Sequence, residues 1–178
     1  MINSFRADNP TLDIFQAHVR SWGLERPTTV SVRNRRSFWI VLSSHEIFFK
    51  EWSMQQRSVG RWRFHLSWWS MEVHRGRDSP LAAIWVHLPC LPLLFHNKFF
   101  LEKIGDLLGE FLCVDCQTLC LEESSSARIC VALDLTSPPP SQLLLPVERV
   151  LEWRHALVYP MLPLFFSSCF LFGHAFSE

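Results

Sequence analysis

Residues 61–69 have the sequence RWRFHLSWW, and this stretch decides the fold class because two chemical types of side chain alternate along it. Every second residue is apolar: Trp62, Phe64, Leu66 and Trp68. The residues before and between them are polar: Arg61, Arg63, His65 and Ser67. Successive side chains of a strand point to opposite faces of a sheet, so the segment is predicted to be a strand with one buried face.

Before this strand, the spacing predicts a helix over 11–22, with Thr11 as its N-cap and Gly23 as its stop. Two strands are then predicted at 28–33 and 37–43, because both are rich in β-branched or aromatic residues. A polar turn of Asn34, Arg35 and Arg36 would join them. A second helix is expected over 44–57.

After this strand, residues 82–89 predict another strand, and an amphipathic helix follows from Asn97 to Gly109. Its apolar face is expected to contain Phe100, Ile104, Leu107 and Leu108. Strands are predicted at 111–115 and 127–134, and the prolines at 138–140 mark a boundary. Residues 142–159 are compatible with either a hairpin or a short helix.

From 37 to 115 the order is strand, helix, strand, strand, helix, strand. This order predicts an α+β fold, a ferredoxin-like or RRM-like antiparallel sheet backed by two helices. The predicted domains are an N-terminal helix and lead-in (1–27), the α+β domain (28–136), a Pro-rich linker and extension (137–163) and a zinc-knuckle remnant (164–178). Many proteins with this fold bind no RNA, so the fold alone predicts no function.

Positive charge is concentrated in the first half of the chain. Up to Pro80 there are 12 Lys+Arg and 7 Asp+Glu, and the remainder has 5 and 10. This asymmetry favours an anionic partner for the first half, or two oppositely charged faces of one domain in contact. Guanidinium groups pair with phosphate and exposed rings stack on bases, which predicts binding of single-stranded RNA or DNA with weak sequence preference. The residues expected to bind are Arg33, Arg35, Arg36, Arg61, Arg63, His65 and Trp69.

Two other interpretations of this composition stay open. The basic face could simply be solvated. Eight tryptophans and fifteen phenylalanines also exceed what a core of this size hides comfortably, which favours an exposed apolar patch and a protein-interaction or self-association module.

The N-terminus lacks the apolar run of a signal peptide, so the six cysteines are expected to be reduced thiols of an intracellular protein, in the nucleus or cytoplasm. Cys113 and Cys116 have CxxC spacing with Cys120 after them, but the segment resembles a strand and structural thiols are expected. No membrane span is expected, because Pro160 and Pro163 interrupt the longest apolar stretch.

Known catalytic patterns are incomplete, so no enzyme activity is expected. The segment HEIFF at 45–49 begins like a zinc-protease helix, but Phe49 stands where the second histidine is needed. The chain contains no GxSxG nucleophile elbow, and its acidic residues are scattered rather than clustered for a two-metal site.

Cys169 and His174 have the spacing of the second and third ligands of a CCHC zinc knuckle. Phe166 stands at the first ligand position, and the fourth would come one residue after Glu178. Two ligands do not close a structural zinc site, so no zinc of useful affinity and no other cofactor is expected for the chain as written. The alternative is that this tail is only apolar and that its histidine is there by chance.

Several short motifs from Ala82 onward are typical of one family. They are Trp85-Val86-His87-Leu88, Leu91-Pro92-Leu93, Ile104-Gly105, Gly109, Val114-Asp115, Thr118 and Ala127-Arg128, and near the end Leu162-Pro163, Phe165, Cys169 and Phe172-Gly173-His174. With these motifs the chain resembles the plant retroelement-associated family whose shared domain of unknown function is numbered four-two-eight-three. The resemblance covers roughly residues 12–178 and is looser before Ala82.

The resemblance implies a polypeptide derived from a retrotransposon's nucleic-acid-binding protein, in which an intact CCHC knuckle holds zinc and binds single strands. The chain departs from the family at His87, where arginine is usual, at Cys90, where glycine is usual, and at Phe166. A degenerate knuckle is therefore expected. A decayed retroelement fragment with no retained activity is the remaining alternative.

Overall fold

The computed structural model describes residues 2–5, 10–23, 28–34, 37–42, 45–54, 58–69, 77–121, 125–147 and 151–172. It divides the chain into two compact units, Met1–Ser79 and Pro80–Glu178. Helices and antiparallel sheets occur together, so the α+β class predicted from the sequence is confirmed. The boundary at Ser79 lies inside the single domain predicted for 28–136.

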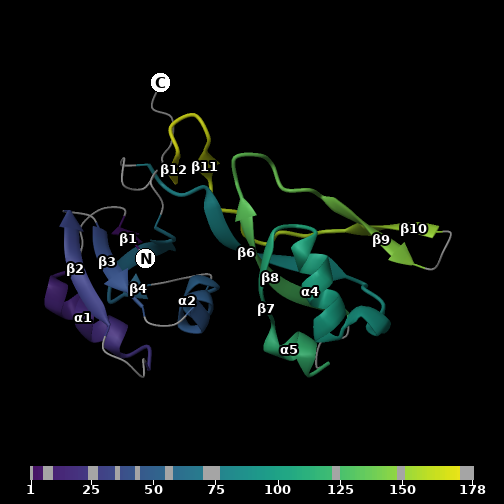
Figure 1. The fold of residues 1–178 in the computed structure, drawn as a ribbon, viewed down its shortest axis with the longest axis horizontal. Helices are drawn as coiled ribbons and strands as arrows, with labels where there is room; N and C mark the ends of the chain where they lie inside the picture. The colour runs from purple at the N-terminus through teal and green to yellow at the C-terminus, as the bar shows by residue number, and fades with distance from the viewer. Residues whose placement is uncertain are drawn as a thin grey trace. The chain divides into compact units, whose positions relative to one another are not determined.

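The first unit is built on one antiparallel sheet (Figure 1, purple to blue). Its elements are β1 (Ile2–Phe5), α1 (Leu12–Arg20), β2 (Thr29–Asn34), β3 (Ser37–Val41), α2 (His45–Trp52), β4 (Ser58–Val59) and β5 (Trp62–Ser67). The strand order is β2-β3-β1-β5-β4, so the first strand in sequence is central in the sheet. Every neighbouring pair is antiparallel.

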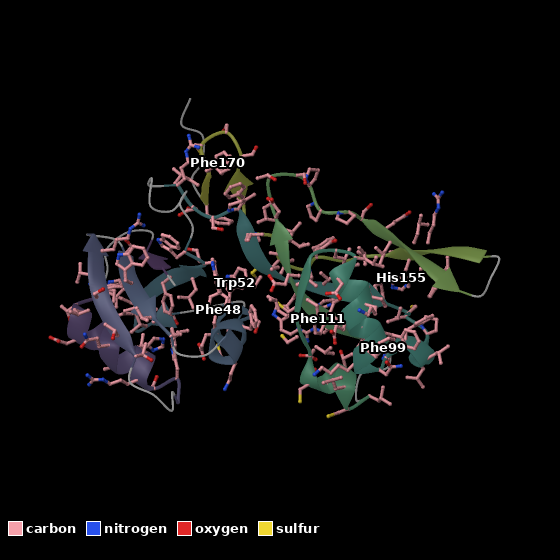
Figure 2. All side chains as sticks on the ribbon, viewed as in Figure 1. Phe48, Trp52, Phe99, Phe111, His155 and Phe170 are labelled. Atoms are coloured by element: carbon pink, nitrogen blue, oxygen red, sulfur yellow. The ribbon has the colours of Figure 1, made fainter. Side chains whose placement is uncertain are left out.

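Aromatic packing on one face of this sheet forms the core of the first unit. Phe15 of α1 is fully buried; its ring stacks on Phe38 of β3 at 4.8 Å and meets Phe64 of β5 edge-on at 5.5 Å. From α2, Phe48 lies beside Trp52 (Figure 2) and contacts Trp68 at 4.6 Å. The apolar positions of β5 thus face the core, as the alternation in 61–69 predicts.

The second unit contains three small antiparallel sheets (Figure 1, teal to yellow). Its elements are β6 (Leu81–Pro89), η1 (Leu93–Phe95), α4 (Lys98–Asp106), β7 (Glu110–Val114), α5 (Cys116–Leu119), β8 (Ser126–Asp134), β9 (Gln142–Val147), β10 (Leu151–Ala156), β11 (Phe165–Phe166) and β12 (Leu171–Phe172). The main sheet has the order β6-β8-β7, while β9 pairs with β10 and β11 with β12. His87 of β6 also bridges to Val158, which follows β10.

Helix α4 packs on the main sheet of the second unit. Its N-cap is Asn97, whose side chain accepts a hydrogen bond from the backbone N–H of Phe100 at 3.1 Å. Leu101 and Ile104 are buried in a core with the apolar residues of β6 and β8. The predicted apolar face of this helix was wrong at Phe100 and Leu107, which are exposed; Phe100 contacts the rings of Phe95 and Phe99 instead.

Three further differences from the sequence predictions concern pairing. The four strands predicted to form one sheet over 37–115 are divided between the sheets of the two units. The reason is that the unpredicted strand β1 pairs with β3 and β5, and that β6 pairs with β8. Cys116 and Cys120 follow β7 on and after the short helix α5, rather than continuing a strand. The segment 142–159, left open as hairpin or helix, forms the β9–β10 hairpin.

Candidate nucleic-acid interface

The sheet of the first unit has a second face, which points away from α1. Because Phe38 and Ile40 are buried on the α1 side, Trp39 and Val41 of β3 lie on the opposite side. Ser31 is directly opposite Trp39, and Ile2 lies between Trp39 and Ser67, so Ser31, Trp39 and Ser67 share one row of the sheet. We call this surface the distal face and define it by Ser31, Ser37, Trp39, Val41 and Ser67.

Arg33 and Trp39 form the best-defined contact on the distal face. The strand register between β2 and β3 shifts between Val32 and Asn34, so Arg33 occupies an irregularity of the bulge type. Such irregularities re-aim a side chain. The guanidinium carbon of Arg33 lies 5.6 Å from the centre of the Trp39 ring, within the range of a cation–π contact. A cation and an aromatic plane are thereby held together on one sheet surface.

Exposure of the distal face is uneven. Ser37 and Ser67 are only 3% and 2% exposed, so this part of the face is covered. At the end of the sheet where β1 begins, Val41 is 63% exposed and Trp69, two residues beyond β5, is 46% exposed. Val41 and Trp69 come two residues after Trp39 and Ser67, the two residues that pair with Ile2. The accessible part of the distal face is therefore the end with Val41 and Trp69, whereas Arg33 and Trp39, next to the covered serines, are half-buried.

The other predicted binding residues are not all brought to this place. Arg61 is exposed in the turn before β5, and its guanidinium carbon lies 5.0 Å from the ring of Trp62, a residue of the opposite face. Arg63 and His65 lie in β5, paired with Ser58 and Ser4, and the structure describes only their backbone. Arg35 and Arg36 lie outside the described residues.

The predicted zinc-ligand remnant lies partly in the β11–β12 hairpin. The Cys169 thiol donates a hydrogen bond to the backbone oxygen of Phe166 at 3.7 Å, across the turn between the two strands. His174 lies outside the described residues. Among the residues that are described, no group of three or more His, Cys, Asp or Glu side chains is arranged to hold a metal ion.

A cluster in the second unit joins residues that are far apart in the sequence. Arg128 of β8 lies with its guanidinium carbon 5.5 Å from the ring centre of Trp85 and with Nη1 3.9 Å from Oδ2 of Asp115. The Thr118 hydroxyl accepts the backbone N–H of Arg128 at 3.0 Å. All four residues belong to the motifs that carry the family resemblance. Their spacing along the sequence does not show that they meet.

Two thiols of the second unit also meet. Cys113 of β7 is directly opposite Cys130 of β8, and both side chains are thiols. A hydrogen bond between the two side chains, together with burial, raises the pKa of Cys130 above its usual range. The CxxC spacing of Cys113 and Cys116 does not predict the pairing of Cys113 with Cys130.

Comparisons with known proteins give no relative: no family model, no curated protein and no solved structure matches the chain. The geometry of the chain's own residues therefore carries the functional argument. No helix within the described ranges is long and apolar enough to cross a membrane.

Proposed function

We propose that the chain is a non-enzymatic nucleic-acid-binding protein that holds single-stranded RNA or DNA on the distal face of its first unit. The observation that carries the proposal is the Arg33 guanidinium held over Trp39 on that face. Bases stack on aromatic rings and on guanidinium planes, and an arginine on the same platform pairs with phosphate. The excess of basic residues up to Pro80 would attract the strand over a longer range.

We also propose that this unit is ferredoxin-like, in the RRM-like variant. Its order of β1, α1, β2, β3, α2 and β5 is the strand-helix-strand-strand-helix-strand plan, and β1 lies between β3 and β5 in an antiparallel sheet. RNA-recognition modules of this plan stack bases on aromatic residues of the sheet. The position of Trp39 on the distal face is in keeping with this use.

The family proposal is that the chain is retroelement-derived and related to the plant domain-of-unknown-function family numbered four-two-eight-three. Its support is a cluster of motif residues around Arg128. The Arg128 guanidinium contacts the Trp85 ring and the Asp115 carboxylate, and the Thr118 hydroxyl accepts the Arg128 backbone N–H. These residues are up to 43 positions apart in the sequence. Residues that contact one another depend on each other for packing. A shared structural role therefore explains the four motif residues better than a chance match of single residues does.

The binding proposal is tested by fluorescence anisotropy of a labelled single-stranded RNA over a salt series. Arg33→Gln is expected to weaken binding roughly tenfold and to reduce the slope of log K against log salt by about 1, because one phosphate contact is lost. Arg33→Lys keeps the charge and is expected to restore the salt slope but not the whole affinity, since an ammonium group lacks the stacking plane.

The matched control is Arg20→Gln, which removes the same charge from an exposed residue at the end of α1, on the other side of the sheet. This control is expected to change affinity by less than about threefold, because its phosphate contribution is only long-range. Equal losses in Arg33→Gln and Arg20→Gln would show that binding follows net charge and not the distal face. Absence of binding at low salt would refute the proposal.

Self-association is the second candidate, and exposed apolar side chains around η1 and α4 favour it. Leu94 is 72% exposed and Phe99 64%, and Leu93 and Leu107 are exposed as well. Apolar association persists or strengthens as salt rises, whereas phosphate binding weakens. Sedimentation of the protein alone at low and high salt separates the two. A monomer under both conditions would exclude self-association, and a monomer without nucleic-acid binding would leave a decayed fragment.

A further inference from the structure

The pair formed by Cys113 and Cys130 has the backbone geometry of a disulfide site. The two residues are directly opposite on β7 and β8. Two positions further along the same pair of strands, the backbone N–H of Asp115 donates to the oxygen of Arg128 at 3.0 Å. Hydrogen-bonded and non-hydrogen-bonded rows alternate, so Cys113 and Cys130 are also in a hydrogen-bonded row, with Cα atoms about 5.5 Å apart. Disulfides span Cα distances of about 4.4–6.8 Å.

The side chains of this pair lie on the same face of the sheet, because directly opposite residues of an antiparallel pair point the same way. Hydrogen bonding with Cys113, together with burial, raises the pKa of Cys130. Cys130 is fully buried, whereas Cys113 is half-buried. The two sulfurs therefore differ in their access to a reagent from solvent, and Cys113 is the one that a small oxidant reaches.

We propose that Cys113 and Cys130 form a reversible disulfide that cross-links β7 to β8 when the protein meets a peroxide. The thiolate of Cys113 attacks one peroxide oxygen, the O–O bond breaks, and hydroxide leaves and takes up a proton, so that Cys113 becomes a sulfenic acid. The sulfur of Cys130 then attacks the sulfur of Cys113. The S–S bond forms, the S–O bond breaks, and the Cys130 proton leaves with the hydroxyl group as water. Two thiols and one peroxide yield one disulfide and two waters.

Position within the sheet makes this bond labile. A disulfide in a hydrogen-bonded row must fit beside the backbone hydrogen bonds of that row, and deviation from relaxed disulfide geometry makes the bond easier to reduce. Strained disulfides of this kind are the regulatory ones, because a thiol reductant reopens them. The site goes beyond the proposed nucleic-acid binding and does not rest on it, since the distal face lies in the first unit.

The chain's other cysteines give the experiment its controls. Cys90, Cys116 and Cys120 are exposed, and Cys116 begins α5 three residues after Cys113. Trypsin leaves Cys113, Cys116 and Cys120 together in the fragment 104–128 and Cys130 in the fragment 129–149. A variant with Cys116→Ser and Cys120→Ser therefore leaves Cys113 as the single thiol of the first fragment.

The full chain and this variant are oxidised with a small molar excess of hydrogen peroxide, alkylated under denaturing conditions, digested with trypsin and analysed by mass spectrometry. Fragments 104–128 and 129–149 are expected to be joined in both proteins, and the joined species should be lighter by two hydrogen atoms than the sum of the two free fragments. Dithiothreitol should separate them. Cys113→Ser is expected to abolish the joined species, whereas Cys90→Ser leaves it unchanged. The full chain alone keeps the test valid if a variant does not fold.

Two outcomes would overturn the proposal. In the first, fragment 129–149 remains completely alkylated after oxidation that has modified the exposed Cys90. In the second, Cys130 is joined to a fragment other than 104–128, or stays joined to 104–128 in Cys113→Ser. Either outcome would show that the contact between Cys113 and Cys130 is packing between two inert thiols.

Discussion

Gly109 is the residue whose replacement the structure evaluates most directly. It follows α4, its backbone N–H donates to the oxygen of Gly105 at 3.0 Å, and it lies against the carbonyl of Ala132 in β8. A Cβ added at Gly109 would be 2.2 Å from that carbonyl oxygen, whereas real Cβ atoms essentially never come within 3.0 Å of such an atom. The Ala132 carbonyl would therefore have to withdraw by at least 0.8 Å, the difference between these two distances.

That movement is costly because β8 is the central strand of its sheet. Ala132 pairs with Ala83 of β6 on one side and with Glu110 of β7 on the other, so it cannot shift without disturbing both ladders. Overpacking of a core costs about 1–3 kcal/mol, and the position of Ala132 suggests the upper end. Alanine also lowers the conformational entropy of the unfolded chain, which stabilises the folded unit by about 0.4–1 kcal/mol. Gly109→Ala is expected to destabilise the second unit by about 2 kcal/mol.

Urea unfolding, monitored by hydrogen exchange in peptides of β6 and β8, measures this loss. A loss of about 2 kcal/mol corresponds to a fall in Tm of roughly 8–16 °C for a unit of this size. Glu110→Ala is the matched control, because it introduces the same side chain at the next residue, which is exposed, and is expected to change stability by less than about 0.5 kcal/mol. Equal midpoints for Gly109→Ala and Glu110→Ala would refute the close approach of Gly109 to β8.

Three further predictions concern polar groups of the second unit. Thr118→Val is expected to cost about 1–3 kcal/mol in urea unfolding, because Thr118 is fully buried and its hydroxyl accepts the Arg128 N–H; Thr118→Ser should recover most of the loss. Asn97→Ala removes the N-cap of α4 and is expected to cost about 1 kcal/mol, with Asn97→Asp close to the parent in the same assay. Burial lowers the pKa of His155 below 6.5, so the unfolded chain binds the proton more tightly and the free energy of unfolding should fall as pH drops below 6.5. His155→Phe should weaken that acid dependence in urea titrations between about pH 7.5 and about pH 5, and an unchanged pH dependence would contradict the assignment.

Periodicity predicted the elements whose burial is one-sided. The alternation in 61–69 and the spacing in 11–22 gave β5 and α1 with their core residues, because each buries one face against a single partner layer. The strand β1 was missed, since Ile2–Phe5 is short and its central position depends on pairing with β3 and β5, which lie far along the chain. Register between distant strands has no local signal, and for the same reason the single sheet predicted over 37–115 was wrong in its pairing.

Local pattern also limited the prediction of the candidate sites. Arg33 was chosen for its charge, but its place over Trp39 follows from a register irregularity that the residues 28–41 do not reveal. The α4 face was misplaced at Phe100 because Phe95, on η1, offers it an aromatic partner outside the helix. Cys113 and Cys130 are neighbours only because β7 and β8 pair, so CxxC spacing directed attention to Cys116 instead.

The residues that carry the family resemblance do mainly structural work in the second unit. Gly105 permits close packing against Phe111 (Figure 2), and Gly109 permits close packing against Ala132. The Thr118 hydroxyl accepts the backbone N–H of Arg128. These contacts support the fold of the second unit and do not bear on binding. Since the charged and aromatic residues of the proposed interface lie in the first unit, the comparison of Arg33→Gln with Arg20→Gln decides whether the chain binds nucleic acid through the distal face.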